Sequence, residues 1–321
     1  MPKSAWSDGL SPKAAGRALL TRACMGTYPT AKAYGRAVVH RRLRRVPPPI
    51  IVYQMGKVGS ETVVRSLRAH PDTRVRGALH VHFLDPARLQ DEEAAYRATW
   101  RGFTQAWHVW AGQALRRHMQ VHPDTRWDVV TLVRDPVARN LSSFFQVGAV
   151  RHGLTFRHGP NHELLDDRAV SDLATAFSEQ FQGHEEPQRW FDDELAAHLG
   201  VDVYATPFAK EQGWQMYESE HARVLLIRLE NLRQVADPAF DRFLGLGSFP
   251  LHERNAGAHK YYGPTYTRFL QRVRLPASYL DAMYESRYVN HFYGTEQAAV
   301  FRRKWEQVGG LSMDRGELPA P

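Results

Sequence analysis

Four short, mainly apolar runs recur along this chain, and segments with helical spacing separate them. The runs occupy residues 50–55, 77–84, 127–133 and 222–229 and contain many β-branched side chains. Such runs are typical of strands that are buried on both faces, as in a parallel sheet. Their alternation with helices predicts an α/β fold in which helices flank a central parallel sheet.

Helical spacing predicts the elements between and after these runs. The expected helices cover residues 61–70, most of 86–121, 136–146, 170–182, 187–199 and 276–290. Residues 151–169 and 254–269 carry glycine and polar side chains and are predicted to be loops. Phe191–Glu194 is expected to form a solvated helix face, and the tryptophans are expected in the core.

A chain of 321 residues is long enough for one large domain with a buried core. We place that α/β domain at residues 49–300, after a basic N-terminal extension at 1–48 and before a C-terminal tail at 301–321. The formal net charge is +8, and residues 1–45 alone carry +9, so the rest of the chain is nearly neutral. A nearly neutral domain excludes a non-specific nucleic-acid binder, and no nucleic-acid partner is expected.

The basic stretch 32–45 has two readings. It could be an amphipathic helix that contacts an anionic membrane, or a solvated helix that lies on the domain, and we favour the second. The single cysteine, Cys24, allows no intramolecular disulfide and no thiolate metal site. Without a spanning segment or a secretory signal core, the expected location is the cytoplasm, with peripheral membrane contact through the N-terminus left open.

A glycine-bearing loop, Gly56–Thr62, connects the first apolar run to a helix start. Free backbone N–H groups and the positive end of the helix dipole favour a phosphate at such a position. The loop is not a Walker A motif, because its lysine, Lys57, precedes the second glycine, Gly59. By itself a glycine turn before a helix is common and carries little functional information.

A second element follows the third apolar run, in the sequence RDPVARNLSSFF at residues 134–145. It places Arg134 at the carboxyl edge of a strand and Ser142 two helical turns further on. An arginine fork with a hydroxyl suits a second phosphate group. A helix cap would explain Arg134 or Asp135 singly, but not why the pair follows a phosphate loop.

Together these motifs resemble the PAPS-dependent sulfotransferase superfamily, where PAPS is 3′-phosphoadenosine 5′-phosphosulfate. GKVGSET is similar to the loop that holds the 5′-phosphosulfate, RDPVARNLSSFF to the element that holds the 3′-phosphate, and LLIRLENL to a later strand. LPASYLDAMYESRYVNHFY is similar to the closing helix, so the resemblance covers roughly residues 50–295. QMGKVGSETV, GWQMY and the HFY ending look most like bacterial capsular polysaccharide synthesis and carbohydrate sulfotransferase-like proteins.

The resemblance implies a P-loop NTPase-like sulfotransferase fold, PAPS as the donor substrate and PAP as the product, with no metal. It implies that Lys57 stabilises the leaving group and that Arg134 and Ser142 hold the 3′-phosphate. The implied cofactor-binding residues are Lys57, Gly59, Ser60, Glu61, Thr62, Arg134 and Ser142, with Arg254 and Lys260 in a late basic loop. Glu61 departs from the family, which has Ser or Thr there; its carboxylate must turn outward for the donor site to hold.

Sulfuryl transfer needs a base for the acceptor hydroxyl, and a histidine suits this role. His80 and His82 alternate on the second run and so share one face near its carboxyl edge. Some carbohydrate sulfotransferases have a similar H-x-H, which implies His82 as base and His80 as its neighbour. Two buried structural histidines or a metal pair are the alternatives.

The resemblance thus implies a sulfotransferase that acts on a hydroxyl acceptor, with a carbohydrate as the expected acceptor. No metal site is expected, because His118 and His122 have helical spacing but lack an acidic third ligand. The rival enzyme is a P-loop nucleotide-dependent kinase, which the loop order disfavours. The rival from another class is a non-catalytic protein of the same fold that binds a polymer or a membrane.

Overall fold

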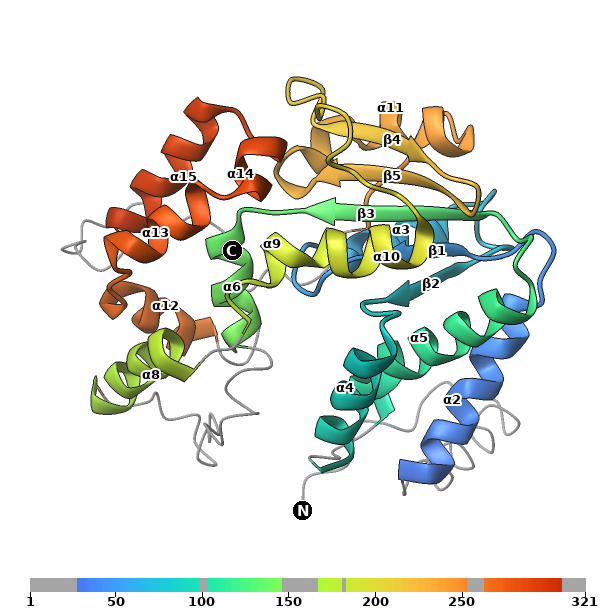
Figure 1. Cartoon of the computed structure of the whole chain (residues 1–321), viewed down its shortest axis with the longest axis horizontal. Helices are drawn as coiled ribbons and strands as arrows, with labels where there is room; N and C mark the ends of the chain where they lie inside the picture. Colours follow the sequence, from blue (N-terminus) through green and yellow to red (C-terminus); the bar gives the residue numbers. More distant parts are fainter. Residues whose placement is uncertain (1–27, 99–102, 146–166, 181–182, 253–262, 308–321) are drawn as a thin grey trace, which may run out of the picture.

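A five-stranded sheet forms the centre of the computed structural model, which describes residues 28–98, 103–145, 167–180, 183–252 and 263–307 (Figure 1). The strand order is β2-β1-β3-β5-β4. The strands are β1 (Ile50–Tyr53), β2 (Ala78–Val81), β3 (Trp127–Val133), β4 (Trp214–Glu218) and β5 (Ala222–Arg228). Strands β2, β1, β3 and β5 pair in parallel, as the apolar runs predict, and the fold is α/β.

The edge strand β4 is the one strand of the described sheet that the apolar runs do not reveal. It pairs antiparallel with β5, with Met216 opposite Leu225. Three of its five residues are only partly buried, so it lacks the continuous apolar pattern of the inner strands. The sheet is therefore mostly parallel rather than wholly parallel.

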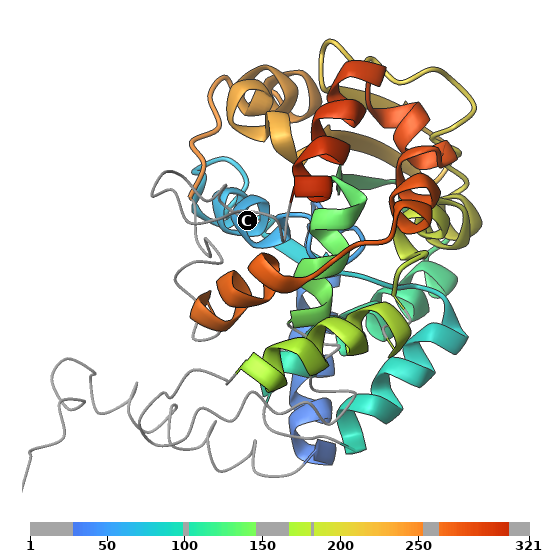
Figure 2. The same cartoon turned by 90° about the vertical axis from the view of Figure 1, so that its left-hand side faces the viewer.

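Helices cover both faces of the sheet, and Figure 2 shows α3 and α11 on one side with the α9–α10 segment on the other. The α-helices are α2 (Tyr28–Leu43), α3 (Ser60–Ala69), α4 (Pro86–Ala98), α5 (Phe103–Val121), α6 (Pro136–Ser143), α8 (Asp167–Gln180), α9 (Glu186–Trp190), α10 (Ala197–Leu199), α11 (Leu232–Leu244), α12 (Gly263–Arg272), α13 (Ala277–Tyr284), α14 (Arg287–Phe292) and α15 (Thr295–Gln307). A π-helical turn, η2 (Phe191–Ala196), joins α9 to α10, and a 3₁₀ turn, η3 (Leu229–Asn231), precedes α11.

Helix α2 lies on the domain, which is the reading we favoured for the basic stretch. Its buried positions, Ala31, Gly35, Val39 and Leu43, recur every four residues and form one stripe. A Cβ at Gly35 would lie 2.5 Å from the Trp110 ring, so a larger residue would push α2 away from α5. The apolar side of α2 is thus used for packing within the chain.

The predicted loop at 254–269 is corrected over its second part. Residues 263–269 belong to α12, whereas residues 254–262 lie outside the described residues. Tyr266 and Phe269 are buried, three residues apart, and both rings pack against Phe145. This contact explains the helix, because two aromatic side chains at helical spacing bury one face.

The predicted solvated face at Phe191–Glu194 is also corrected. Phe191 and Glu194 are 1% and 3% exposed, whereas Asp192 and Asp193 are exposed. The π-helical turn η2 widens the helix at this point, as such turns often do at functional sites. The Glu194 carboxylate accepts hydrogen bonds from the Tyr53 hydroxyl and from the backbone N–H of Leu84 at 2.7 Å, so it is a structural acceptor inside the protein.

The C-terminal elements pack on the domain beyond the boundary that we placed at residue 300. The predicted helix 276–290 is two helices, α13 and α14, because the Ser286 side chain caps a new helix that begins at Arg287 by accepting from the Val289 N–H. Helix α15 runs through residue 300, and its Trp305 is 3% exposed. The Trp305 indole donates to the Asp135 carboxylate at 2.7 Å, which joins α15 to the start of α6.

Candidate functional site

The sheet order places a topological switch point between the carboxyl ends of β1 and β3. From β1 the chain continues to β2 on one side, and β3 lies on the other side. In open α/β sheets ligands bind at such a topological switch point. The loop after β1 and Arg134 after β3 both lie there, so the two predicted phosphate elements come together.

The loop after β1 has an unusual backbone. Lys57 has a φ of 76° and Gly59 a φ of 91°, both in the left-handed region. For a residue with a side chain this conformation costs on the order of 1–2 kcal/mol and often marks a ligand site. Gly59 is also the N-cap of α3, and its backbone alone forms the cap. The loop therefore presents main-chain groups at the start of a ten-residue helix.

Two arginines fix the direction of the loop peptides. Arg134 Nη1 donates to the Lys57 carbonyl at 3.0 Å, and Arg139 Nε donates to the Gly56 carbonyl at 3.1 Å. In a trans peptide the N–H points away from the C=O. The N–H groups of Lys57 and Val58 therefore point away from the arginines, and successive backbone N–H groups in a turn can bind an anion.

Arg134 is itself held on its main chain. Tyr288 of α14 accepts from the Arg134 N–H at 3.0 Å and donates to its carbonyl at 2.8 Å. The next residue, Asp135, caps α6 by accepting from Val137 N at 3.1 Å, with Pro136 at the first helical position. Tyr284 donates to the same carboxylate oxygen at 2.8 Å. These contacts fix the corner that carries the predicted 3′-phosphate arginine.

Arg139 is a site residue to which the sequence assigned no role. It is 1% exposed, and besides Gly56 it contacts the Gly183 carbonyl at 3.0 Å and the Glu186 carboxylate at 2.7 Å. Burial raises the pKa of Glu186, but the charges of Arg139 and Arg88 more than offset this and lower it overall. The only sequence signal was the spacing of the two arginines in RDPVAR.

His82 lies just beyond β2, beside the end of β1. Its Nδ1 is 2.8 Å from the Gln54 carbonyl, which can only accept, so Nδ1 of the neutral ring carries the hydrogen. This tautomer makes Nε2 the basic nitrogen. The His82 carbonyl accepts from the Trp190 indole at 3.0 Å. Hydrogen bonds therefore hold His82 both at its ring and at its main chain.

Two further histidine rings contact His82. The His80 ring centroid lies 4.5 Å away, as expected from H-x-H, and that of His108 on α5 lies 4.7 Å away. Burial lowers the pKa of His82, and it lowers that of His80 further, with the charges of neighbouring histidines adding to the effect. Both shifts favour the neutral ring, the form that a base requires. His108 was missed because it lies on a helix distant in sequence.

The remaining predicted residues occupy the ends of α3 and α6. Ser60 and Thr62 lie in the first turn of α3, and Ser142 lies two turns into α6, half-buried. The Glu61 side chain is 49% exposed, and its carboxylate oxygens lie 3.5 Å from Arg65 Nε and 3.9 Å from His80 Nδ1. Arg254 and Lys260 lie outside the described residues.

Lys304 of α15 is a further basic residue near Arg134. Its ammonium lies 4.8 Å from the centroid of the Trp305 ring, and Trp305 binds Asp135. Burial lowers the pKa of Lys304; the charge of Arg134 acts in the same direction and that of Asp135 opposes it. The sequence does not single out Lys304, because residues 301–321 are predicted to be a tail.

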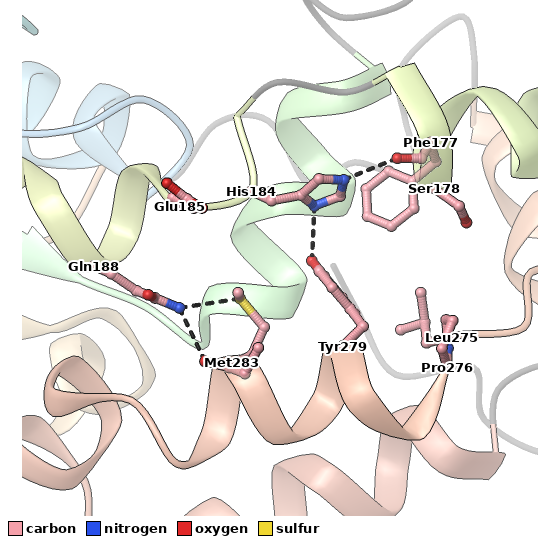
Figure 3. Close-up of a pocket in the computed structure, with 10 residues that line it drawn as sticks. Phe177, Ser178, His184, Glu185, Gln188, Leu275, Pro276, Tyr279 and Met283 are labelled. Carbon is pink, nitrogen blue, oxygen red and sulfur yellow. Dashed lines mark hydrogen bonds between the residues drawn. The ribbon is translucent and has the colours of Figure 1, made fainter.

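A cavity of about 280 Å³ lies on the outer side of α6, between α8, α9 and α13 (Figure 3). His184 and Tyr279 line it and contact each other at 3.1 Å (Nδ1 to Oη). Asn140 of α6 donates to Tyr279 at 3.1 Å, and His184 Nε2 lies 2.9 Å from the Phe177 carbonyl. These polar groups are thus engaged with each other, and the rest of the lining is mainly apolar.

The described residues contain no group of three or more His, Cys, Asp or Glu side chains that is arranged to hold a metal ion. Among the same residues, no helix has the length and apolar character needed to cross a membrane.

One comparison with known proteins gave a match. Residues 165–294, less than half of the chain, match a family model described as "Putative capsular polysaccharide synthesis protein". The matched segment includes Arg228, Glu186 and the whole lining of the cavity beside α6. No curated protein and no solved structure matched the chain.

Proposed function

We propose that this protein is a sulfotransferase with a P-loop NTPase-like sulfotransferase fold, which moves a sulfuryl group from PAPS to a carbohydrate hydroxyl. One observation carries the proposal: Arg134, at the end of β3, donates to the carbonyl of Lys57 in the phosphate loop at 3.0 Å. The contact joins the two elements that the resemblance assigns to the two phosphate groups of PAPS. The matched family supports a polysaccharide as the acceptor class.

In this proposal, His82, Lys57 and the loop N–H groups have separate roles in the sulfuryl transfer. The acceptor hydroxyl gives its proton to His82 Nε2 while its oxygen forms a bond to sulfur. The bond from sulfur to the 5′-phosphate oxygen breaks, and the electron pair remains on that oxygen. Lys57 and the N–H groups of the loop stabilise the resulting negative charge. PAPS supplies the sulfuryl group and leaves as PAP.

Positioning and charge supply the remaining catalysis. Arg134 presents a guanidinium with several donors, which suits the 3′-phosphate, and Ser142 adds a hydroxyl donor. Because Tyr288 holds the main chain of Arg134 on both sides, the guanidinium starts from a fixed point. Discrimination between PAP and AMP is therefore expected to come from this corner.

A calorimetric titration of the purified protein with PAP tests the proposal, with AMP, ADP and ATP plus Mg²⁺ as comparisons. Tight PAP binding that AMP does not match is expected, because the two nucleotides differ by the 3′-phosphate. Preference for ATP with Mg²⁺ would instead support a kinase. Radiolabelled sulfate transfer from PAPS to a panel of polysaccharides then tests turnover; PAP binding without any transfer would support the non-catalytic alternative.

A further inference from the structure

The buried pair of Arg139 and Glu186 lies between the loop after β1 and the three histidine rings of His80, His82 and His108. Their side chains are 2% and 16% exposed, and Arg139 Nη2 lies 2.7 Å from Glu186 Oε2. A buried guanidinium without its carboxylate would be strongly unfavourable, so each partner depends on the other. Together with the Gly56 and Gly183 carbonyls, Glu186 therefore fixes where the Arg139 fork lies.

On one side this pair reaches the phosphate loop. Arg139 Nε donates to the Gly56 carbonyl at 3.1 Å, while Nη1 donates to Gly183 in the turn before α9. The fork thus joins the loop to the start of α9, which Figure 1 shows beside α6. Movement of Glu186 would release the Gly56 peptide from its present orientation.

On the other side the same helix reaches His82. Glu186 is the first residue of α9 and Trp190 is the last. The Trp190 indole donates to the His82 carbonyl at 3.0 Å, and its ring packs against Tyr53 with centroids 4.9 Å apart. A single helical turn therefore carries one contact to the loop and one to the histidine.

We propose that Glu186 is a positioning residue that joins the phosphate loop to His82, by holding Arg139 against the Gly56 carbonyl and by starting the helix whose Trp190 holds the His82 main chain. The inference rests on the proposed function in treating His82 as the base. It adds a residue that does not itself touch either reactant.

Electrostatics provide a readout that a purely structural role would not change. The ionisable groups facing His82 from the surrounding elements are Glu186 on α9, Glu92 on α4, Arg139 on α6, His80 on β2 and His108 on α5. The Glu186 carboxylate favours the imidazolium form and so raises the pKa of His82 against the larger effect of burial. Removing that charge must lower the pKa of His82.

The test compares Glu186→Gln with Glu185→Gln, the same change at the neighbouring exposed carboxylate. In each protein, NMR follows the titration of the His82 ring, assigned with a His82→Gln variant, and calorimetry measures PAP affinity. Glu186→Gln is expected to lower the His82 pKa and to raise the Kd for PAP severalfold. Glu185→Gln is expected to match the wild type in both measurements.

The proposal is overturned if either the His82 pKa or the PAP affinity of Glu186→Gln equals that of Glu185→Gln. The NMR titration needs no turnover, so it still decides the effect of Glu186 on His82 if the wild type does not bind PAP and the proposed function fails. Should Glu186→Gln not fold, Trp190→Phe keeps the aromatic ring but removes the N–H donor. It is expected to shift the His82 resonances without changing PAP affinity, and unchanged resonances would overturn the link.

Discussion

Arg134 and Lys57 are 77 residues apart in the chain, yet the guanidinium of the first donates to the carbonyl of the second at 3.0 Å. The contact has two consequences. It turns the following N–H of the loop away from Arg134, toward the side where an anion would bind. It also brings the cation of the predicted 3′-phosphate site next to the loop of the predicted 5′-phosphosulfate site.

Replacing Arg134 with alanine should therefore weaken PAP binding by about 1.5–3 kcal/mol, the range for a hydrogen bond to a charged group. AMP binding should change less, because AMP lacks the 3′-phosphate. Arg126→Ala is the control: Arg126 lies before the opposite end of β3 and pairs with Glu218 at the surface. Calorimetry of both variants checks this, and equal PAP affinities would defeat the assignment of Arg134.

Replacing His82 with alanine should reduce turnover by about 100-fold or more, the lower range for a general base. Donor affinity should stay nearly constant, because His82 is bound to Gln54 and Trp190 rather than to the phosphate elements. The comparison variant is His221→Ala, at an exposed position before β5. Initial rates with saturating PAPS, together with PAP titrations, measure both effects; substantial residual turnover would remove His82 from the mechanism.

Replacing Gly59 with alanine should lower both stability and PAP affinity. Its φ of 91° costs a residue with a Cβ about 1–2 kcal/mol. The added Cβ would also lie 2.5 Å from Leu229 Cδ1, which must then move. Denaturant unfolding and calorimetry measure the two effects.

Two other glycines help to distinguish the cost of the positive φ from the cost of the added Cβ at Gly59. Gly245 also has a positive φ, but a Cβ there would meet no atom within 4 Å, so Gly245→Ala isolates the backbone cost. Gly56 has open space for a Cβ and is not among the glycines of positive φ. If Gly59→Ala reduced PAP affinity no more than Gly245→Ala does, the loop would not be the phosphate site.

Glu194 should make stability depend on pH. Burial raises its pKa to about 7, against the hydrogen bonds from Leu84, Tyr53 and Asp85 that favour the carboxylate. In the unfolded chain the pKa is 4.5, so the folded state binds the proton more tightly. The resulting stabilisation is complete below pH 4.5 and is lost as the pH rises through 7.

The variant Glu194→Gln carries no titrating group and should lack this dependence. Between pH 5 and pH 8 the wild type should therefore lose up to about 3 kcal/mol relative to Glu194→Gln. Urea unfolding at several pH values measures the difference between the two proteins. A constant difference across this range would show that Glu194 does not titrate there.

Much of the fold was predictable because its signals are local. The four parallel strands, the helices between them and the glycine loop follow from side-chain spacing within windows of a few residues. The loop motif and RDPVARNLSS likewise predict Lys57 and Arg134 as site residues, and the structure brings these two residues into contact. Strand β4 escaped because an edge strand exposes part of each face and lacks a continuous apolar run.

The amino-acid sequence by itself therefore determined the α/β alternation, the glycine loop after β1 and the order of the two elements that we propose to bind phosphate. Only the tertiary structure decided which polar side chains that are distant in the sequence contact each other. These pairs are Arg139 with Glu186, Tyr53 with Glu194, and Trp305 with Asp135. The physical reason is that periodicity and turn chemistry act between near neighbours. The partner of a buried polar group, by contrast, is selected by packing between elements, and Tyr53 and Glu194 are 141 residues apart.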